Sequence, residues 1–332
     1  MVITKTPFRM SFFGGGTDYQ PFFDEYGGSV ISTTFDKYIY TTIRHFPPFF
    51  ESRNCIIYSK FENTMTVDEI EHPLIRNAMK FLDMHDMHIV YDSDLPARSG
   101  LGSSSSFAVG LVLGFNALKG KYIDKKKLAQ TAVYLERVLC AEDGGWQDQI
   151  AVAFGGLNRI DFNKGDFTVK PIIVSAERKK LLNDHLMLFF TGFSRISAKV
   201  AGEQVKAIKD KKNELLEMLK IVNLGERVLS DKNSDILEFG RLLDYTWKLK
   251  RGITNFISND VIDTIYARAN KAGAIGGKLM GAGGGGFLML FAEPCKQSAV
   301  KEALSDLLYV PFKFEDGGAS VLYYAPETLA AV

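Results

Sequence analysis

The chain has few cysteines, and they show no pattern. Of its 332 residues only Cys55, Cys140 and Cys295 are cysteines, an odd and scattered set without C-x-x-C spacing. This number and spacing exclude a disulfide framework and the usual kind of cysteine zinc site. The cysteine content therefore favours a reducing compartment, and we expect a cytoplasmic location.

The chain also has almost no net charge. Lys and Arg number 40 against 39 Asp and Glu, which gives a formal net charge of +1. A chain with this balance has no global positive field to hold a polyanion. We therefore expect no nucleic acid among its partners.

No segment is apolar over the length that a bilayer requires. The longest apolar stretch, residues 107–118, is shorter than the ~20 residues of a membrane-spanning helix and contains Gly110, Gly114 and Asn116. Residues 1–10 alternate apolar and polar side chains and lack the apolar core and cleavage site of a signal peptide. We expect no membrane partner.

What is present is the composition of an ordinary globular protein, with 46% hydrophobic and 24% charged residues. Runs rich in β-branched and aromatic residues predict strands at 31–35, 38–45, 55–59, 88–91, 157–162, 167–174 and 186–190. Apolar spacing predicts helices near 75–82, 104–118 and 125–140 and through most of 198–272. Strands and helices mixed without strict alternation favour an α+β fold, with a domain boundary near residue 180.

A glycine- and serine-rich segment lies between a predicted strand and a predicted helix, with the sequence LPARSGLGSSSS from residue 95 to residue 106. Gly100 and Gly102 would let backbone N–H groups approach phosphate oxygens, and the start of the helix adds a partial positive charge. A serine hydroxyl there can reach a magnesium ion. An N-cap is the alternative explanation, but a cap needs one serine and no preceding Gly-x-Gly. No Walker A sequence occurs, so this phosphate loop is of another kind.

A second glycine-rich segment reads GKLMGAGGGGF from residue 277 to residue 287. It matches G-x-G-x-x-G through Gly281, Gly283 and Gly286, which raises the alternative of a Rossmann oxidoreductase. That fingerprint opens a helix, whereas these glycines lead into the apolar strand predicted at 287–291. A glycine hairpin without a ligand is the other alternative, although four consecutive glycines cost folding entropy that a plain turn does not require.

With the segment TPFRMSFFGGGTDY at residues 6–19, these loops resemble the three motifs of the GHMP kinase superfamily, in the same order and at suitable spacing. That superfamily includes galactokinase, homoserine kinase, mevalonate kinase and phosphomevalonate kinase. The resemblance implies a two-domain GHMP kinase fold, with a ribosomal protein S5-like N-terminal domain (1–180) and a ferredoxin-like C-terminal domain (181–332). ATP and Mg²⁺ would bind in the cleft between them. The GGGTD form, GWQDQ at 145–149 and residues 278–287 are most similar to D-glycero-D-manno-heptose 7-phosphate kinases.

The resemblance also implies roles for single residues. Asp148 would accept the proton of the sugar hydroxyl, and Arg9 would stabilise this carboxylate and offset developing charge. Ser104 and Glu136 would hold Mg²⁺, which prefers hard oxygen ligands. A first-turn carboxylate for Asp148 and an exposed helical glutamate for Glu136 are the structural alternatives. The residues expected to contact ATP are Gly100, Leu101, Gly102, Ser103, Ser104, Ser105, Gly283 and Gly284.

For the acceptor, Asp18 resembles the aspartate with which galactokinases hydrogen-bond ring hydroxyls. Where galactokinases have Glu-His before Thr-Asp, this chain has Gly15 and Gly16, so a larger or phosphorylated substituent would fit. The residues expected to contact the substrate are Gly15, Gly16, Thr17, Asp18, Arg195, Lys250 and Arg251. Lys250 and Arg251 also end a predicted helix, where basic residues are common because of the helix dipole. For Lys278, contact with a phosphate and a capping role at the strand both remain open.

The first hypothesis is an ATP-dependent kinase that acts on a small phosphosugar. It would convert the anomeric hydroxyl of heptose 7-phosphate to give the 1,7-bisphosphate, on the way to nucleotide-activated heptose for surface glycans. A kinase for L-fucose or another unphosphorylated sugar is the alternative enzyme. A non-catalytic sugar-sensing protein is the alternative of another class, and the presence of Arg9, Ser104, Glu136 and Asp148 together argues against it. A homodimer is compatible with the sequence, which does not decide the oligomeric state.

Overall fold

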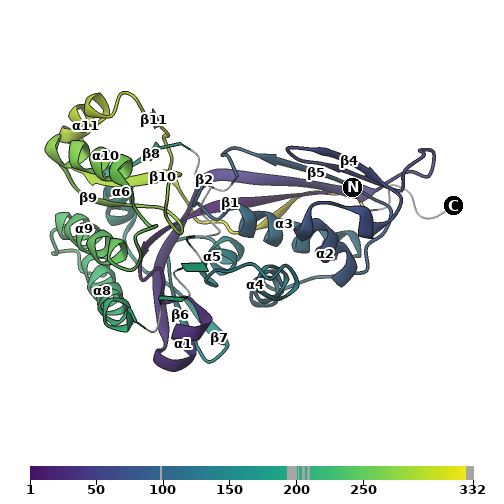
Figure 1. Ribbon diagram of the computed structural model, residues 1–332, viewed down its shortest axis with the longest axis horizontal. Helices are drawn as coiled ribbons and strands as arrows, with labels where there is room; N and C mark the ends of the chain where they lie inside the picture. The colour runs from purple at the N-terminus through teal and green to yellow at the C-terminus, as the bar shows by residue number, and fades with distance from the viewer. Residues whose placement is uncertain (98, 193–199, 201, 204–205, 208–209, 327–332) are drawn as a thin grey trace.

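The computed structural model describes residues 1–97, 99–192, 200, 202–203, 206–207 and 210–326. Figure 1 shows an elongated molecule with two lobes. One lobe is a long sheet with helices α2 to α5 beside it, and the other gathers helices α8 to α11 around a smaller sheet. Arg195 lies outside the described residues.

The first sheet has the strand order β13-β1-β2-β5-β3-β4; β6 and β12 also pair with β2, and β7 pairs with β6. Its strands are β1 (Val2–Phe13), β2 (Gly28–His45), β3 (Asn54–Ile57), β4 (Phe61–Thr64), β5 (Met87–Ser93), β6 (Asn158–Asn163), β7 (Asp166–Pro171), β12 (Phe314–Glu315) and β13 (Ser320–Tyr324). The strands predicted at 31–35 and 38–45 are one strand, β2. Its register against β1 shifts at Pro7 and Phe8, so an irregularity in the ladder stands where the sequence suggested a break.

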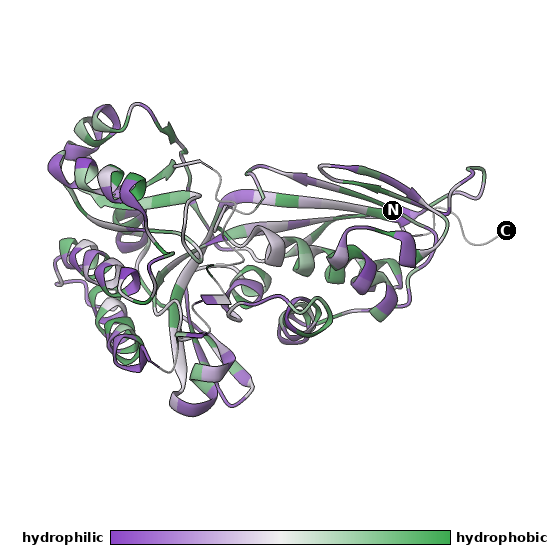
Figure 2. Cartoon of the chain, viewed as in Figure 1, coloured by the Kyte–Doolittle hydropathy of each residue, from purple (hydrophilic) through white to green (hydrophobic). Residues whose placement is uncertain are grey.

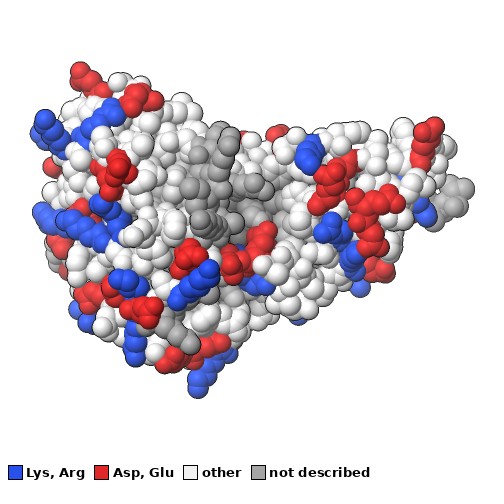
Figure 3. All heavy atoms as spheres, in the orientation of Figure 1, with Lys and Arg blue, Asp and Glu red and all other residues white. Residues whose placement is uncertain are grey.

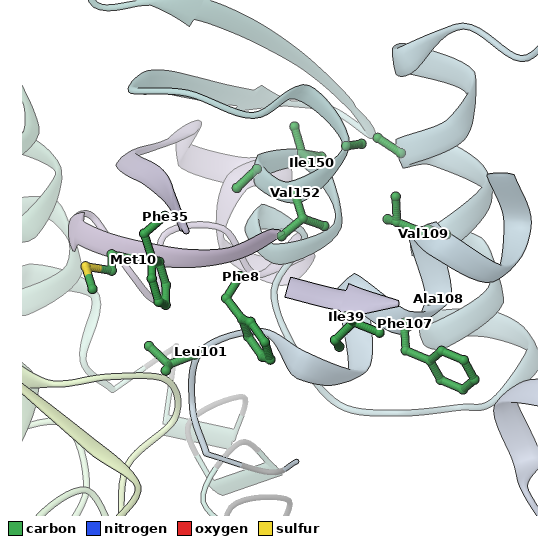
Figure 4. Packing of buried hydrophobic residues seen from close by; sticks show 14 of the residues in the cluster. Phe8, Met10, Phe35, Ile39, Leu101, Phe107, Ala108, Val109, Ile150 and Val152 are labelled. Carbon is green, nitrogen blue, oxygen red and sulfur yellow. The ribbon is translucent and has the colours of Figure 1, made fainter. Parts of the chain in front are cut away.

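Helices cover this sheet with apolar side chains. They are α1 (Gln20–Tyr26), α2 (Pro73–Phe81), α3 (Ser103–Leu118), α4 (Lys125–Tyr134) and α5 (Gln147–Phe154), with a short 3₁₀ turn η1 (Val67–Glu69). Helix α6 (Ala176–His185) lies in the other lobe. Gly114 lets α3 approach β2 closely, because a Cβ there would lie 2.4 Å from Ile43 Cδ1. Figure 4 shows Phe8 of β1, Phe35 of β2 and Leu101 of the loop before α3 in this buried layer.

The helix predicted at 125–140 is divided in the structure. After α4 the chain continues as a π-helical segment, η2 (Leu135–Leu139). Side-chain spacing does not distinguish a short π-helical turn from the α-helix that it extends, so a single helix was predicted here. The π-helical segment carries Glu136, and the change of helical pitch therefore sets where this carboxylate points.

The second sheet is antiparallel, with the strand order β11-β8-β10-β9. Its strands are β8 (Leu186–Phe190), β9 (Ala274–Leu279), β10 (Phe287–Ala292) and β11 (Leu308–Tyr309). The other helices of this lobe are α8 (Lys212–Ser230), α9 (Leu237–Arg251), α10 (Asp260–Lys271) and α11 (Gln297–Ala303), with a short 3₁₀ turn η3 (Pro294–Lys296). Figure 2 shows hydrophobic residues along β10 and mixed hydropathy on the helices, consistent with the complete burial of this strand. Gly276 lets β9 pack closely on α9, since a Cβ there would lie 2.1 Å from Gly240 O.

The end of the chain returns to the first sheet. β12 pairs with β2 and β13 pairs with β1, both antiparallel. The last strands therefore belong to the same sheet as the first strand, and the division at residue 180 stays a prediction.

The surface in view carries charged side chains of both signs. On the face shown in Figure 3, basic and acidic side chains are interspersed and form no continuous patch of one sign. Within the part of the chain that the structure describes, no helix combines the length and the apolarity needed to cross a membrane.

Candidate active site

A cavity of about 660 Å³ lies where the three glycine-rich motifs meet. Its walls come from the end of β1, the loop before α3, the start of α5, the end of α9 and β9. This volume is within the range of small-molecule sites. Of the residues predicted from the sequence, the cavity brings together Arg9, Gly15, Gly16, Asp18, Gly100, Gly102, Ser103, Ser104, Ser105, Glu136, Asp148 and Lys250.

The two glycine-rich loops pack on each other through their backbones. A Cβ on Gly100 would lie 2.3 Å from Met280 O, and one on Gly281 would lie 2.4 Å from Gly100 Cα. Both glycines have a positive φ, +83° and +74°, which side chains disfavour. The glycines after β9 therefore hold the predicted phosphate loop in place. The glycines thus have a structural role, and binding of a ligand by this segment stays a prediction.

Two glycines of the same segment lie elsewhere. A Cβ on Gly283 would lie 2.7 Å from Ile257 Cα, and the N–H of Gly284 donates to Ile257 O at 3.0 Å. Both residues thus contact the chain between α9 and α10, and neither lines the cavity. Their contact with ATP stays a prediction.

The serines after the phosphate loop do not cap helix α3. Gly102 is the N-cap of α3 with φ +83°, and no side chain caps this helix end. The capping explanation for the serine run therefore fails, and Ser103, Ser104 and Ser105 line the cavity. The first N–H groups of a helix have no intrahelical acceptor, which makes this end suitable for a phosphate group. The side chain of Leu101 is buried, so its expected contact with ATP can only come from its backbone.

Arg9 and Asp148 form a bidentate ion pair at the edge of this loop. Arg9 donates from Nε to Oδ1 of Asp148 at 2.7 Å and from Nη2 to Oδ2 at 2.6 Å. Its Nη1 donates to Gly100 O at 2.8 Å, so one guanidinium fixes the carboxylate to the phosphate loop. The guanidinium is almost fully buried, whereas 23% of the Asp148 side chain is exposed. A carboxylate held in this way is oriented and can still be reached by a ligand.

Asp18 also lines the cavity, and it is almost fully buried. Its Oδ1 accepts from the N–H of Gly16 at 2.9 Å and its Oδ2 from the N–H of Gln147 at 3.3 Å. Burial raises the pKa of Asp18; the Gly16 N–H opposes this shift and the Asp148 charge adds to it. Gly145 is required here, since a Cβ on it would lie 1.8 Å from Asp18 Oδ2. Gly145 is a residue that the sequence did not single out by itself.

Glu136 is fully buried, so the alternative of an exposed helical glutamate is wrong. Its Oε2 accepts from Ser105 Oγ at 2.8 Å and from Gln149 Nε2. Its Oε1 is buried and has no hydrogen-bond partner among the described residues. A buried carboxylate oxygen without a partner, beside serine hydroxyls, is a suitable ligand for a hard cation. The neighbour of Glu136 is Ser105, whereas Ser104, the predicted ligand, lies on the cavity wall.

Protein side chains alone would not complete a metal site. Among the described residues, no cluster of three or more His, Cys, Asp or Glu side chains could hold a metal ion. Mg²⁺ commonly binds through one or two protein ligands together with water and phosphate oxygens. The residues present therefore fit a magnesium ion that arrives with a nucleotide.

Two buried lysines face the same cavity. Lys250 Nζ donates to Gly281 O, and Lys278 Nζ donates to Phe12 O at 3.2 Å. Burial lowers the pKa of Lys250 to about 8, and the positive charge of Arg9 adds to this effect. Burial likewise lowers the pKa of Lys278, with the charges of Lys250 and Arg9 adding to it. Three neighbouring cationic groups indicate an anionic ligand.

Two predicted substrate contacts lie away from this cavity. Thr17 is buried, and its hydroxyl lies within hydrogen-bond distance of Gly14 O and Ser29 O, where it fixes the turn. Arg251 forms an ion pair with Asp263 and lines a separate cavity of about 410 Å³. The roles proposed for these residues, and for Arg195, stay predictions.

Comparison with known families matches both halves of the chain. The GHMP kinases N terminal domain matches residues 73–156, and the GHMP kinases C terminal domain matches residues 227–310. The first match contains the phosphate loop, Glu136 and Asp148, and the second contains Lys250 and the second glycine-rich loop. Most of the residues that line the cavity lie within these two matches, whereas those of β1 and the turn after it precede them.

Among curated proteins, the D-glycero-alpha-D-manno-heptose 7-phosphate kinase of Campylobacter jejuni is 29% identical over 91% of this chain and 92% of its own length. A bifunctional fucokinase/GDP-fucose pyrophosphorylase of Arabidopsis thaliana is 27% identical over 66% of this chain, which corresponds to 21% of that longer protein. The crystal structure of a D-glycero-D-manno-heptose 1-phosphate kinase from Bacteroides thetaiotaomicron superimposes with a TM-score of 0.72 at 26% identity, covering 98% of this chain and 100% of that one. The chain belongs to the GHMP kinase family, whose members are phosphotransferases that act on hydroxyl groups.

Proposed function

We propose that this protein is an ATP- and Mg²⁺-dependent kinase that phosphorylates the anomeric hydroxyl of D-glycero-D-manno-heptose 7-phosphate to give the 1,7-bisphosphate. The observation that carries the proposal is the position of the Arg9–Asp148 pair. Arg9 ties Asp148 to the phosphate loop, and Asp18 lines the same cavity. The names of the Campylobacter and Bacteroides relatives, both heptose phosphate kinases, support this choice of acceptor.

The nucleotide phosphates would bind at the start of α3. Gly100 and Gly102 bring backbone N–H groups to the cavity wall without a side chain in the way, and the helix end favours negative charge. Glu136 and a serine of this helix would hold Mg²⁺, which offsets the charge of the phosphates. Arg9, held between Gly100 and Asp148, adds a fixed positive charge close to the transferred group.

The acceptor sugar would lie between Asp18 and Asp148. Asp18 would accept hydrogen bonds from ring hydroxyls, as a carboxylate suits two O–H donors. Each oxygen of Asp148 accepts one hydrogen bond from Arg9 and keeps a lone pair for the reacting hydroxyl. As the sugar oxygen bonds to the γ-phosphorus and the bond to ADP breaks, Asp148 takes the hydroxyl proton. Its partial exposure lets the proton pass to solvent afterwards.

The test is an ADP-release assay with ATP, Mg²⁺ and a set of acceptors. Heptose 7-phosphate should be the best substrate, and ³¹P NMR of the product should show a new anomeric phosphate. Unphosphorylated heptose and L-fucose should react at least tenfold more slowly. Equal turnover of unphosphorylated heptose would refute the phosphorylated acceptor, and a preference for L-fucose would favour the alternative kinase that the fucokinase relative suggests.

Other parts of the hypothesis stay predictions. A non-catalytic sugar sensor would have no need for an oriented carboxylate beside a phosphate loop, and we infer catalysis for that reason. The cytoplasmic location and the possible homodimer rest on the sequence alone.

A further inference from the structure

Three polar side chains converge on the space above Gly15. A Cβ built on Gly15 would lie 3.7 Å from Ser11 Oγ, 3.7 Å from Gln147 Nε2 and 4.0 Å from Lys278 Nζ. These residues come from β1, α5 and β9, and all of them line the cavity. Gly15 is not among the glycines with positive φ, so its backbone does not require glycine. What the glycine provides at this position is open space.

The polar atoms around this space have few partners within the protein. Ser11 is 5% exposed, and its Oγ has no hydrogen-bond partner among the described residues. Within the same residues, Oε1 of Gln147 is also buried without a partner. Burying an unsatisfied polar group costs about 1–3 kcal/mol, so such groups are expected to meet a ligand.

Lys278 is the charged member of this group. Its side chain is 2% exposed, and its Nζ donates to Phe12 O. Across the part of the chain that the structure describes, no ion pair within 4.0 Å includes Lys278. A buried ammonium without a counter-ion is costly unless an anion joins it.

We propose that Ser11, Gln147 and Lys278 form the subsite for the phosphate that the acceptor already carries, and that Gly15 lacks a side chain in order to admit this group. The inference rests on the proposed function and assigns its specificity to these residues. A phosphate monoester offers three terminal oxygens as acceptors. The serine hydroxyl, the glutamine amide and the ammonium group supply matching donors.

The position of the subsite fits a single acceptor that reaches both ends of the site. Gln147 and Asp148 are successive residues in the first turn of α5, so their side chains diverge by about 100°. The N–H of Gln147 donates to Asp18, the charge of Asp148 acts on Asp18 and that of Asp18 acts on Lys278, so this carboxylate lies close to both the subsite and the base. A sugar with a phosphate at one end and the reacting hydroxyl at the other would therefore span Lys278, Asp18 and Asp148.

If Lys278 binds the phosphate of the acceptor, binding should also change the protonation of its side chain. The groups that act on Lys278 are Lys250 from α9, Arg9 from β1 and Asp18; burial and the two cations lower its pKa, and Asp18 opposes them. A bound phosphate favours the protonated ammonium, so binding of the acceptor should be accompanied by proton uptake above neutral pH. Calorimetry in buffers of different ionisation enthalpy would measure this uptake.

The decisive experiment compares acceptors with and without phosphate. In Lys278→Met, the ratio of kcat/KM for heptose 7-phosphate to that for unphosphorylated heptose should fall about 10- to 100-fold, the range for lost charged hydrogen bonds. The KM for ATP should stay within twofold, and the proton uptake should disappear. Lys248→Met is the matched control, because Lys248 is 67% exposed and pairs with Asp244. It should keep the wild-type ratio.

Gly15→Ala tests the same subsite without removing a charge. The added methyl group would make ordinary van der Waals contacts, so the variant should fold, yet it occupies the proposed phosphate position. The ratio should again fall at least tenfold. An equal loss for both sugars in either variant would overturn the inference, and a rise confined to the KM for ATP would move Lys278 to the nucleotide.

Failure of the proposed function can be told apart from failure of this inference. If the wild type phosphorylates heptose 7-phosphate but Lys278→Met keeps the ratio, the function stands and the subsite is wrong. If the wild type prefers an unphosphorylated sugar, the function is wrong, and inorganic phosphate becomes the probe. Phosphate should then inhibit competitively with the sugar in the wild type and not in Lys278→Met; equal inhibition of both proteins would overturn the subsite.

Discussion

Replacing Asp148 by asparagine is the perturbation that most directly tests the catalytic arrangement. Both carboxylate oxygens accept a hydrogen bond from Arg9, at 2.7 and 2.6 Å. In Asp148→Asn one oxygen becomes an NH₂ group, which donates and cannot accept from Arg9. The change keeps the size of the side chain but removes the proton acceptor and one of the two charge-assisted hydrogen bonds.

The expected effects differ for catalysis and for stability. Loss of a general base reduces kcat by roughly 10²- to 10⁴-fold, or about 3 to 5 kcal/mol in the activation free energy. The free energy of unfolding should fall by only about 1–2 kcal/mol, because a single charge-assisted hydrogen bond is lost at a side chain that is partly exposed to solvent. ATP binding should persist, since the phosphate loop is also held by the contact between Gly100 and Gly281.

The assay measures ADP release at saturating ATP and acceptor, together with the Kd of a fluorescent ATP analogue and the denaturant midpoint. Asp166→Asn is the control, because Asp166 belongs to an exposed ion pair with Lys126. This control should keep wild-type turnover. A kcat of Asp148→Asn within threefold of the wild type would refute the assignment of Asp148 as the base.

Three further changes test other parts of the site. Gly281→Ala should weaken ATP binding at least tenfold and lower the Tm, because the new Cβ would lie 2.4 Å from Gly100 Cα at a backbone with φ +74°; an unchanged Kd for ATP would contradict the packing argument. Glu136→Gln should raise the Mg²⁺ concentration needed for half-maximal activity at least tenfold, because it removes the negative charge from a buried carboxylate whose Oε1 has no partner among the described residues. Titration of the activity with Mg²⁺ measures this concentration, and an unchanged value would count against the metal role of Glu136. The pKa of Lys250 in the folded protein, about 8, lies below its usual value of 10.5. Between these two pH values the unfolded chain therefore binds more protons than the folded chain does. The contribution of Lys250 to the free energy of unfolding should rise with pH across this window, by about 3 kcal/mol in total. In Lys250→Met, denaturant titrations from pH 7.5 to 10 should show a rise that is smaller by about that amount, with the contribution of Lys278 remaining. An unchanged rise would show that Lys250 does not contribute to it.

Much of the secondary structure could be predicted because its signals are local. The helix predicted from residue 104 begins at Ser103, and the strand predicted at 186–190 is β8. The phosphate loop combines a turn that needs glycine with the start of an apolar helix, and both features lie within twelve residues. Family membership followed from the same short segments.

The continuity of β2 depended on a distant segment. The sequence suggested a break near Asp36, since an aspartate and a lysine interrupt the apolar run. In the structure the N–H of Asp36 donates to Lys313 O, and its carboxylate accepts from the N–H of Lys313. The returning chain thus satisfies polar groups that would otherwise favour a turn.

The choice between neighbouring basic residues also needed the tertiary structure. Lys250 and Arg251 are adjacent at the end of α9, and their side chains diverge by about 100°. Lys250 consequently faces the cavity, whereas Arg251 reaches Asp263. No property of the two residue types distinguishes them before α9 is packed against β9.

The sequence by itself determined the fold class, the family and the chemical character of the loops, because each depends on residues close together in the chain. Only the tertiary structure decided which side chains share a cavity and which charges lose their water. Arg9 and Asp148 are separated by 139 positions, and Lys278 and its acceptor Phe12 by 266. Burial and the distances between such residues are set by the packing of two sheets and their helices, and these two quantities fix the pKa values and the hydrogen bonds of the site.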